Sequence, residues 1–191
     1  DNMYAYEYVN GEMLSNISDE SLMRKFLDDC KLRLWNAAGD SENKKFLDDC
    51  EEMYQTKTKE RVASLFGSEL DKLSVINGVI EDMLNKVDWD WFYEKAIPSN
   101  FHGDLQPENI LYDKGKDKFV LIDWRQRFGS NVEAGDVYYD LGKLYHAIMI
   151  NGQSILKDMF SYSREGNSAS VDSSLYNSTS FLLTMTMIGI T

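Results

Sequence analysis

The chain has 191 residues, of which 32 are acidic and 20 are basic, so its formal net charge is −12. This acidic excess argues against nucleic-acid binding, which requires basic side chains that neutralise phosphates. Hydrophobic residues make up 43% of the chain, enough for one domain with a sizeable core or for a small two-part unit. The two cysteines are too few for a disulfide scaffold or a zinc site, so we expect reduced, half-buried thiols and a cytoplasmic location.

The two ends of the chain have simple patterns. Aromatic and other side chains alternate from Met3 to Val9, which is typical of an edge strand, and Asn10–Gly11 follows as a turn signal. No signal peptide is expected, because this segment lacks a basic region. The apolar run 181–191 is too short to span a membrane, and we expect it to form a core helix or strand. The Ser-rich segment 163–180 before it is expected to be a loop.

Three amphipathic helices are predicted between these ends. Apolar residues recur every three or four positions along 18–34, 41–66 and 73–87. Ser18 and Ser41 are the candidate N-caps of the first two helices. The neighbouring acids at 28–29 and 48–49 would point about 100° apart on a helix, so we interpret them as solvated faces rather than as metal ligands.

The most informative stretch is FHGDLQPENILYDKGKDKFVLIDW, residues 101–124. Its two short apolar runs are predicted to be strands joined by a charged hairpin turn, 110–112 and 119–122. Asp104 and Asn109 lie five positions apart in the polar loop before the hairpin, and Asp123 follows the second strand. The hairpin therefore directs three oxygen-bearing side chains to one point.

These side chains suit phosphoryl transfer, in which the protein positions a hydroxyl group and holds a divalent metal against the phosphates. Asp104 would accept the proton of the hydroxyl, and Asn109 and Asp123 would hold Mg²⁺, which prefers oxygen ligands. Protein kinases have the same order of His, Asp, Leu and Asn in their catalytic loop. His102 stands first in this order, where we expect it to hydrogen-bond the loop, and Gly103 stands where protein kinases carry Arg.

Together with GDVYYDLGKL at 135–144, the stretch resembles the aminoglycoside phosphotransferase and choline kinase family, small-molecule relatives of the protein kinases. The resemblance implies an enzyme that uses ATP and Mg²⁺. It implies the same roles for the three oxygen-bearing side chains, with Asp104 as the catalytic base. It also implies that Asp140 braces the catalytic loop.

The segment YEYVNGEML also resembles this family, in which such a segment is the hinge between two lobes and contacts adenine. Glu7, Tyr8 and Val9 are therefore candidate nucleotide contacts, and an ordinary edge strand is the alternative. The aromatic and acidic stretch 88–93 has two interpretations as well, a pocket for a cationic group or a part of the core.

The implied fold is α+β and mainly helical, the C-terminal lobe of a protein-kinase-like fold with a small β-hairpin at the catalytic loop. Residues 1–14 would be a hinge-like strand leading to a missing N-terminal lobe, and residues 15–191 a helical lobe that carries the catalytic loop at 101–124. None of the 12 glycines falls in the GxGxxG arrangement that covers the nucleotide in protein kinases. We therefore expect either a fragment of a longer enzyme or a protein that lacks this lobe and is inactive alone.

The implied activity is transfer of the γ-phosphate of ATP to a hydroxyl group of a small molecule that resembles choline, an amino sugar or a sugar. The acidic composition would favour a cationic acceptor, although solubility is the simpler explanation for it. Arg125 and Arg127 would suit phosphate or an anionic acceptor instead. The alternative function is that of a catalytically inactive kinase-like lobe used as a binding or scaffold module.

Overall fold

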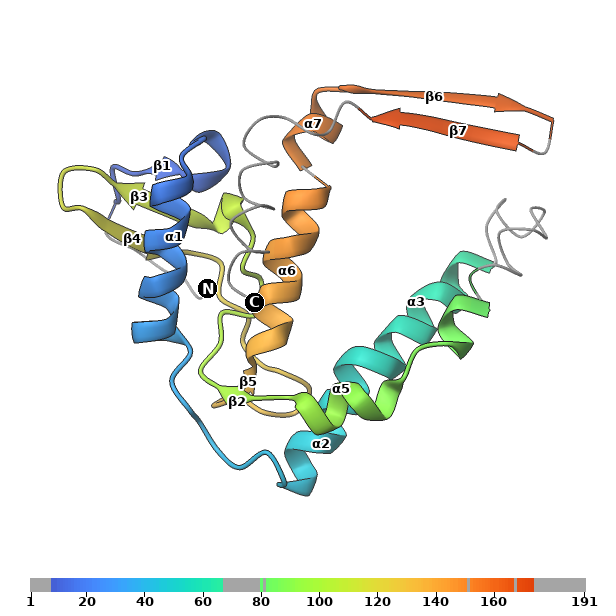
Figure 1. Cartoon of the computed structure of the whole chain (residues 1–191), viewed down its shortest axis with the longest axis horizontal. Helices are drawn as coiled ribbons and strands as arrows, with labels where there is room; N and C mark the ends of the chain where they lie inside the picture. The colour runs from blue at the N-terminus through green and yellow to red at the C-terminus, as the bar shows by residue number, and fades with distance from the viewer. Residues whose placement is uncertain (1–7, 67–79, 81, 151, 167, 174–191) are drawn as a thin grey trace, which may run out of the picture.

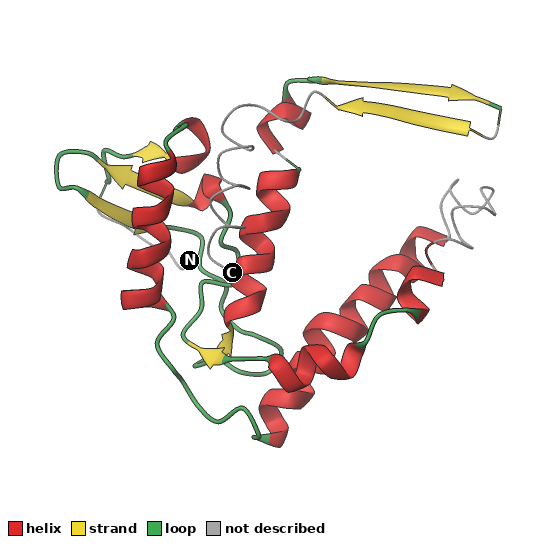
Figure 2. Ribbon diagram, viewed as in Figure 1, coloured by secondary structure: helices red, strands yellow, loops and turns green. Residues whose placement is uncertain are grey.

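The computed structural model describes residues 8–66, 80, 82–150, 152–166 and 168–173, and its elements form three groups (Figure 1). A small sheet lies with α1 and α6. Helices α2, α3 and α5 extend away from it, and α7 leads to a projecting hairpin, as the ribbon in Figure 2 also shows. The α-helices are α1 (Glu20–Asp29), α2 (Lys44–Glu51), α3 (Lys57–Phe66), α5 (Trp89–Lys95), α6 (Val137–Met149) and α7 (Gly152–Leu156). Of these described helices, none has both the length and the apolar character that a membrane span requires.

The strands are short and antiparallel. They are β1 (Glu12–Met13), β2 (Pro98–Ser99), β3 (Ile110–Asp113), β4 (Lys118–Leu121), β5 (Gly135–Asp136), β6 (Phe160–Glu165) and β7 (Ser168–Ser173). They pair in the orders β1-β3-β4, β2-β5 and β6-β7. Four shorter helical turns complete the described part, the 3₁₀ turns η1 (Leu14–Asn16) and η5 (Pro107–Asn109) and the π turns η2 (Cys30–Leu34) and η3 (Glu52–Thr56).

The predicted hairpin at the HGD loop, which we define as residues 102–109, is confirmed. β3 and β4 pair with Ile110 opposite Leu121. The turn between them is closed by Asp113, whose Oδ1 accepts the backbone N–H groups of Gly115 at 3.0 Å and Lys116 at 3.1 Å. This local hydrogen bonding is the reason that a charged, glycine-containing run forms a turn.

The first strand among the described residues lies after the end of the predicted one. Residues 8–10 form no strand, and β1 instead pairs with β3, with Glu12 opposite Tyr112 and Met13 opposite Leu111. Residues 3–7 of the predicted strand lie outside the described residues. Pairing against an existing strand, rather than alternation of aromatic side chains, decides where this strand forms.

The first hydrophobic core lies between α1, the β3–β4 hairpin and α6. Its buried side chains include Met23 and Phe26 of α1, Ile110 of β3 and Leu144 of α6. Phe26 also packs edge to face against Phe119 of β4, with 5.1 Å between the ring centroids. The apolar stripe predicted for residues 18–34 therefore faces the hairpin that carries the candidate site.

The helix starts differ from the predicted caps by one or two residues. α1 is capped by Asp19 rather than by Ser18, because the Asp19 carboxylate accepts the N–H group of Ser21 at 2.8 Å. α2 is capped by Asn43 rather than by Ser41. Asp, Asn and Ser cap about equally well, so the pattern located the helices but not their first residues.

The second hydrophobic core connects α2 and η3 to the segments that flank the HGD loop. Its buried apolar side chains are Phe46, Cys50, Met53, Ala96, Phe101 and Phe128. The chain is helical from residue 44 to 66, close to the predicted range 41–66. Of the predicted helix 73–87, residues 80 and 82–85 are helical, whereas 73–79 and 81 lie outside the described residues.

The prediction that residues 48–49 form a solvated face is wrong for Asp49. Its side chain is only 3% exposed, and its Oδ1 accepts the backbone N–H group of Ser130 at 2.6 Å. Gly129 lies beside it with φ +56°, and an added Cβ there would lie 2.9 Å from the Asp49 Cβ. A buried carboxylate of α2 is thus hydrogen-bonded to the segment after Trp124.

Gly129→Ala should destabilise the protein by about 1–3 kcal/mol, because the left-handed backbone and the clash with Asp49 both oppose a Cβ. Urea unfolding measures the change. Gly166→Ala is the matched control, since Gly166 has a similar φ of +58° and no atom near its Cβ position within the described residues. Equal losses in the two variants would show that the contact with Asp49 costs nothing.

The prediction of a loop over residues 163–180 is wrong for its first half. β6 and β7 pair from Phe160 opposite Ser173 to Glu165 opposite Ser168. Gly166 takes a left-handed conformation in the turn. The serines of this hairpin lack the apolar alternation that indicates a strand, so composition alone indicated a loop. Residues 174–191, including the apolar run 181–191, lie outside the described residues.

Candidate functional site

The HGD loop lies between the two hydrophobic cores. Phe101, just before it, packs in the second core, and Leu105 and Ile110 are fully buried in the first. The polar residues between these anchors have little freedom to move. The sequence therefore positions a polar loop by burying the apolar residues on either side of it.

Asp140, in the first turn of α6, holds the start of the HGD loop. Its fully buried carboxylate accepts the backbone N–H groups of His102 at 2.8 Å and Gly103 at 2.7 Å, and the indole N–H of Trp35 at 3.1 Å. Burial raises the pKa of Asp140, and these three hydrogen bonds oppose that rise. The carboxylate thus orders the loop backbone from its buried side.

Gly103 has a conformation that excludes the arginine found there in protein kinases. Its φ is +81°, and an added Cβ would lie 2.8 Å from the ring of Phe101 and would overlap the Arg125 side chain. Only glycine fits this left-handed position without displacing its neighbours.

His102 connects the loop to the segment after β4. Its Nε2–H donates to the carbonyl of Ile122 at 2.8 Å, and its Nδ1 accepts the N–H group of Asp104 at 3.2 Å, so these partners assign the tautomer. The ring is fully buried and packs against Trp124, 4.8 Å between centroids. Both ring nitrogens are occupied, which leaves neither for a substrate.

Asp104 and Asn109 are in direct contact. The Asn109 amide donates to the Asp104 carbonyl at 2.9 Å and approaches its Oδ2 at 3.4 Å. The other carboxylate oxygen, Oδ1, lies 2.9 Å from the Gln106 amide nitrogen and 2.9 Å from Nζ of Lys143. Burial opposes ionisation of Asp104, but the bonds from Lys143 and Gln106 outweigh it and hold its pKa below the usual value.

Asp123 is exposed to solvent in a segment whose backbone contacts the loop. The backbone N–H of Ile122 donates to the carbonyl of Asn109 at 3.0 Å, so Asp123 follows directly after a contact with the loop. Asp123 is exposed and has a left-handed φ of +61°, a conformation that aspartate adopts more readily than most residues and that Asp117 and Asp158 also have.

The donor set at this point fits Mg²⁺. Within the described residues, the Asp123 carboxylate and the Asn109 side-chain oxygen have no hydrogen-bond or ion-pair partner. No cluster of three or more His, Cys, Asp or Glu in that part of the chain could hold a metal alone. Mg²⁺ is usually held by one or two carboxylates together with phosphate and water, and an amide oxygen with one carboxylate is compatible with that pattern.

The candidate nucleotide contacts lie elsewhere on the hairpin. Tyr8, which is 86% exposed, and Val9 line a cavity of about 420 Å³ at the β3–β4 turn. Its other lining residues are Asn10, Asp113, Gly115, Lys116 and Lys118. Asp123 follows the opposite end of β4, so the structure does not bring these contacts to the HGD loop. Glu7 lies outside the described residues.

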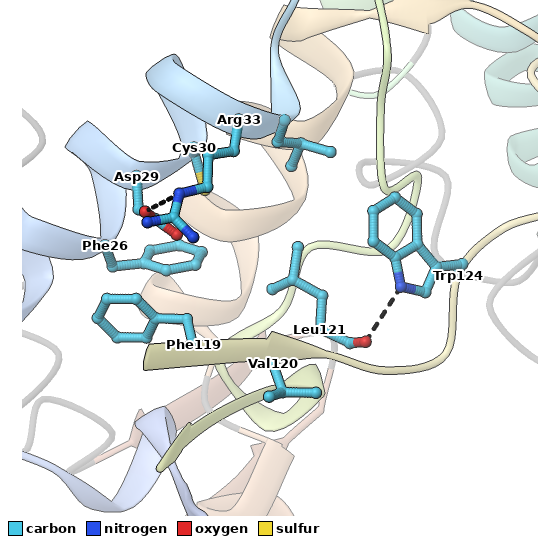
Figure 3. Close-up of a pocket in the computed structure, with 9 residues that line it drawn as sticks. Phe26, Asp29, Cys30, Arg33, Phe119, Val120, Leu121 and Trp124 are labelled. Atoms are coloured by element: carbon cyan, nitrogen blue, oxygen red, sulfur yellow. Dashed lines mark hydrogen bonds and ion pairs between the residues drawn. The ribbon is translucent and has the colours of Figure 1, made fainter. Parts of the chain in front are cut away.

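A second cavity, of about 340 Å³, lies between α1, η2 and β4 (Figure 3). Its lining is largely apolar and consists of Phe26, Asp29, Cys30, Arg33, Leu34, Phe119, Val120, Leu121 and Trp124. The two charged residues form an ion pair with each other, Asp29 Oδ1 to Arg33 Nε at 2.8 Å, as Figure 3 shows. The cavity therefore presents no unpaired charge for phosphate.

Both cysteine thiols are buried rather than half-buried as expected. Burial, reinforced by nearby carboxylates, raises the pKa of Cys50 to about 12 and raises that of Cys30 as well. Ellman's reagent at pH 8 should therefore modify neither thiol in the native protein, because the thiolate fraction of Cys50 is only about 10⁻⁴. Both should react after denaturation in urea. Rapid reaction before unfolding would contradict the burial.

Lys143 and Gln106 both contact the Asp104 carboxylate, and neither was predicted as a site residue. A signal for Lys143 was present, since it stands three residues after Asp140 and residues so spaced share one face of a helix. Gln106 gave no comparable signal, because a polar loop residue has many possible partners.

A family model matches the part of the chain that carries this site. The model of the phosphotransferase enzyme family (APH) matches residues 34–169, more than half of the chain, and this range includes the HGD loop, the hairpin and α6. No curated protein and no solved structure has significant similarity to the chain.

Proposed function

Because the chain belongs to the phosphotransferase enzyme family, we propose that it transfers the γ-phosphate of ATP to a hydroxyl group of a small molecule. The family implies a protein-kinase-like fold, with which the described helices and small antiparallel sheets are compatible. The observation that supports the proposal most is the Asp104 carboxylate, partly exposed at 35% and held on Oδ1 by two donors. Its second oxygen, Oδ2, has a long contact of 3.4 Å with the Asn109 amide, which a substrate hydroxyl group would replace.

In this proposal Asp104 is the general base. Its Oδ2 accepts the proton of the acceptor hydroxyl, for which it needs a distance of about 2.6–3.2 Å. The hydroxyl oxygen forms a bond to the γ-phosphorus as the bond from that phosphorus to the oxygen of ADP breaks. Asp140 and His102 support the reaction only by holding the backbone of the loop.

Asn109 and Asp123 would hold Mg²⁺ in the same proposal. The bound ion neutralises the charge of the phosphates. The chain's own contribution is to order these two ligands, since the Asn109 amide is hydrogen-bonded to Asp104 and the backbone on either side of Asp123 is tied to the loop.

We also propose the domain arrangement implied by the sequence. Residues 15–191 would form the C-terminal lobe, and residues 1–14 the connection to an N-terminal lobe. Glu7, Tyr8 and Val9 would contact the nucleotide at this connection. The cavity beside Tyr8 and Val9 supports this assignment only in part, because Asp123 follows the other end of β4.

Among acceptors we propose a choline-, amino-sugar- or sugar-like alcohol. The net charge of −12 suits a cationic molecule. Arg125 does not oppose this choice, because its guanidinium donates to the Arg127 carbonyl at 3.1 Å and to the Tyr139 hydroxyl at 3.3 Å. An ATP-dependent enzyme of this kind would act in the cytoplasm.

The test is transfer of radioactive phosphate from [γ-³²P]ATP, with Mg²⁺, to a panel of such alcohols by the intact protein that contains this chain. Labelling of one class of alcohol is the expected result. Absence of transfer, together with no thermal stabilisation by MgATP, would favour a non-catalytic binding module instead.

A further inference from the structure

Lys143 of α6 contacts the proposed catalytic base, Asp104. It lies nearly two turns after the N-terminus of α6 and three residues beyond Asp140, so both side chains leave the same face of the helix. The carboxylate of Asp140 is buried beneath the loop, whereas the Lys143 side chain reaches its edge and is 29% exposed. Its Nζ lies 2.9 Å from Oδ1 of Asp104.

The ion pair with Asp104 does not use all of this ammonium group. A lysine ammonium has three donors, and within the described residues only Asp104 accepts from it. Asp104 Oδ1 is also bound by Gln106, so the carboxylate is oriented even without the lysine. A partly exposed ion pair adds little stability by itself.

The HGD loop contains no Lys or Arg, so any cation at the reacting centre must come from another element. An acceptor oxygen bound to Asp104 lies about 3 Å from the carboxylate. Just before the reaction, the same acceptor oxygen lies about 3–3.5 Å from the γ-phosphorus of ATP. A flexible side chain whose Nζ lies 2.9 Å from that carboxylate is therefore within reach of an oxygen of the transferred group.

We propose that Lys143 is a catalytic residue that donates a hydrogen bond to the phosphoryl group as it passes from ATP to the acceptor. The proposal rests on the proposed function. Lys143 keeps its protons throughout, the acceptor proton goes to Asp104, and the positive charge offsets charge on the phosphoryl oxygens. Positioned cations of this kind stabilise the transition state of phosphoryl transfer.

The test compares Lys143→Met and Lys143→Arg in the intact protein, with Lys31→Met on the exposed side of η2 as control. Lys143→Met should lower kcat about 10²–10³-fold, and Lys143→Arg should restore part of it. The decisive measurement is calorimetric affinity for MgADP with and without aluminium fluoride, which mimics the transferred group. Lys143→Met should lose the gain in affinity from aluminium fluoride while its affinity for MgADP alone stays within about twofold.

The outcomes separate the two proposals. If the wild type transfers phosphate and Lys143→Met keeps its gain from aluminium fluoride, the lysine only positions Asp104 and this inference is overturned while the proposed function stands. If the wild type transfers no phosphate to any alcohol, both proposals fail. Circular dichroism of each variant checks folding, and should Lys143→Met not fold, Lys143→Gln, which keeps a polar end, takes its place.

Discussion

Asp104→Asn in the intact protein lowers kcat by about 10²–10⁴-fold, the usual contribution of a general base. The amide keeps the shape of the carboxylate and still accepts a hydrogen bond from Lys143, but it cannot take the proton of a hydroxyl group. The affinity for MgATP should change little, because the proposed metal ligands are Asn109 and Asp123. Steady-state kinetics and calorimetry give the two quantities.

Asp28→Asn is the control for this experiment, since Asp28 is an exposed aspartate on α1 outside the site. Its kcat should equal that of the wild type. A kcat of Asp104→Asn within about threefold of the wild-type value would remove Asp104 from the role of base. A large loss of MgATP affinity would place Asp104 among the nucleotide or metal ligands instead.

The contacts of the HGD loop were predictable to the extent that they follow from spacing and strand register. Antiparallel pairing of Ile110 with Leu121 places Asn109 across from Ile122, so Asp123 must follow close to the loop. The turn signal and the two apolar runs fixed this register in advance. The contact between Asp104 and Asn109 is similarly local.

Contacts between distant segments were not predictable in this way. Asp49 resembles any exposed acid of an amphipathic helix, and only its partner Ser130, far along the chain, explains its burial. The ion pair of Lys143 with Asp104 likewise depends on how α6 packs against the loop. Periodicity identifies which face of a helix is apolar but does not identify the polar groups that tertiary packing brings to its edge.

The role of Asp140 was implied by resemblance alone, and its geometry leads to the second large effect. Asp140→Asn should destabilise the protein by roughly 2–4 kcal/mol, because the new NH₂ group must face a buried backbone N–H of His102 or Gly103. The HGD loop should lose its order as well, so kcat should fall even at temperatures at which the variant is folded. Urea unfolding and kinetics below the melting temperature measure the two effects.

Asp48→Asn is the matched control, since Asp48 is exposed on α2, and its unfolding free energy should stay within about 0.5 kcal/mol of wild type. The effects on stability and on kcat together distinguish a residue that holds the loop in place from a residue that takes part in the reaction. Asp104→Asn, at a partly exposed side chain, should lower kcat with little loss of stability, whereas Asp140→Asn should lower both. If Asp140→Asn were as stable as the wild type, the three N–H groups would not depend on the carboxylate, and the loop would have to be held by its buried apolar flanks alone.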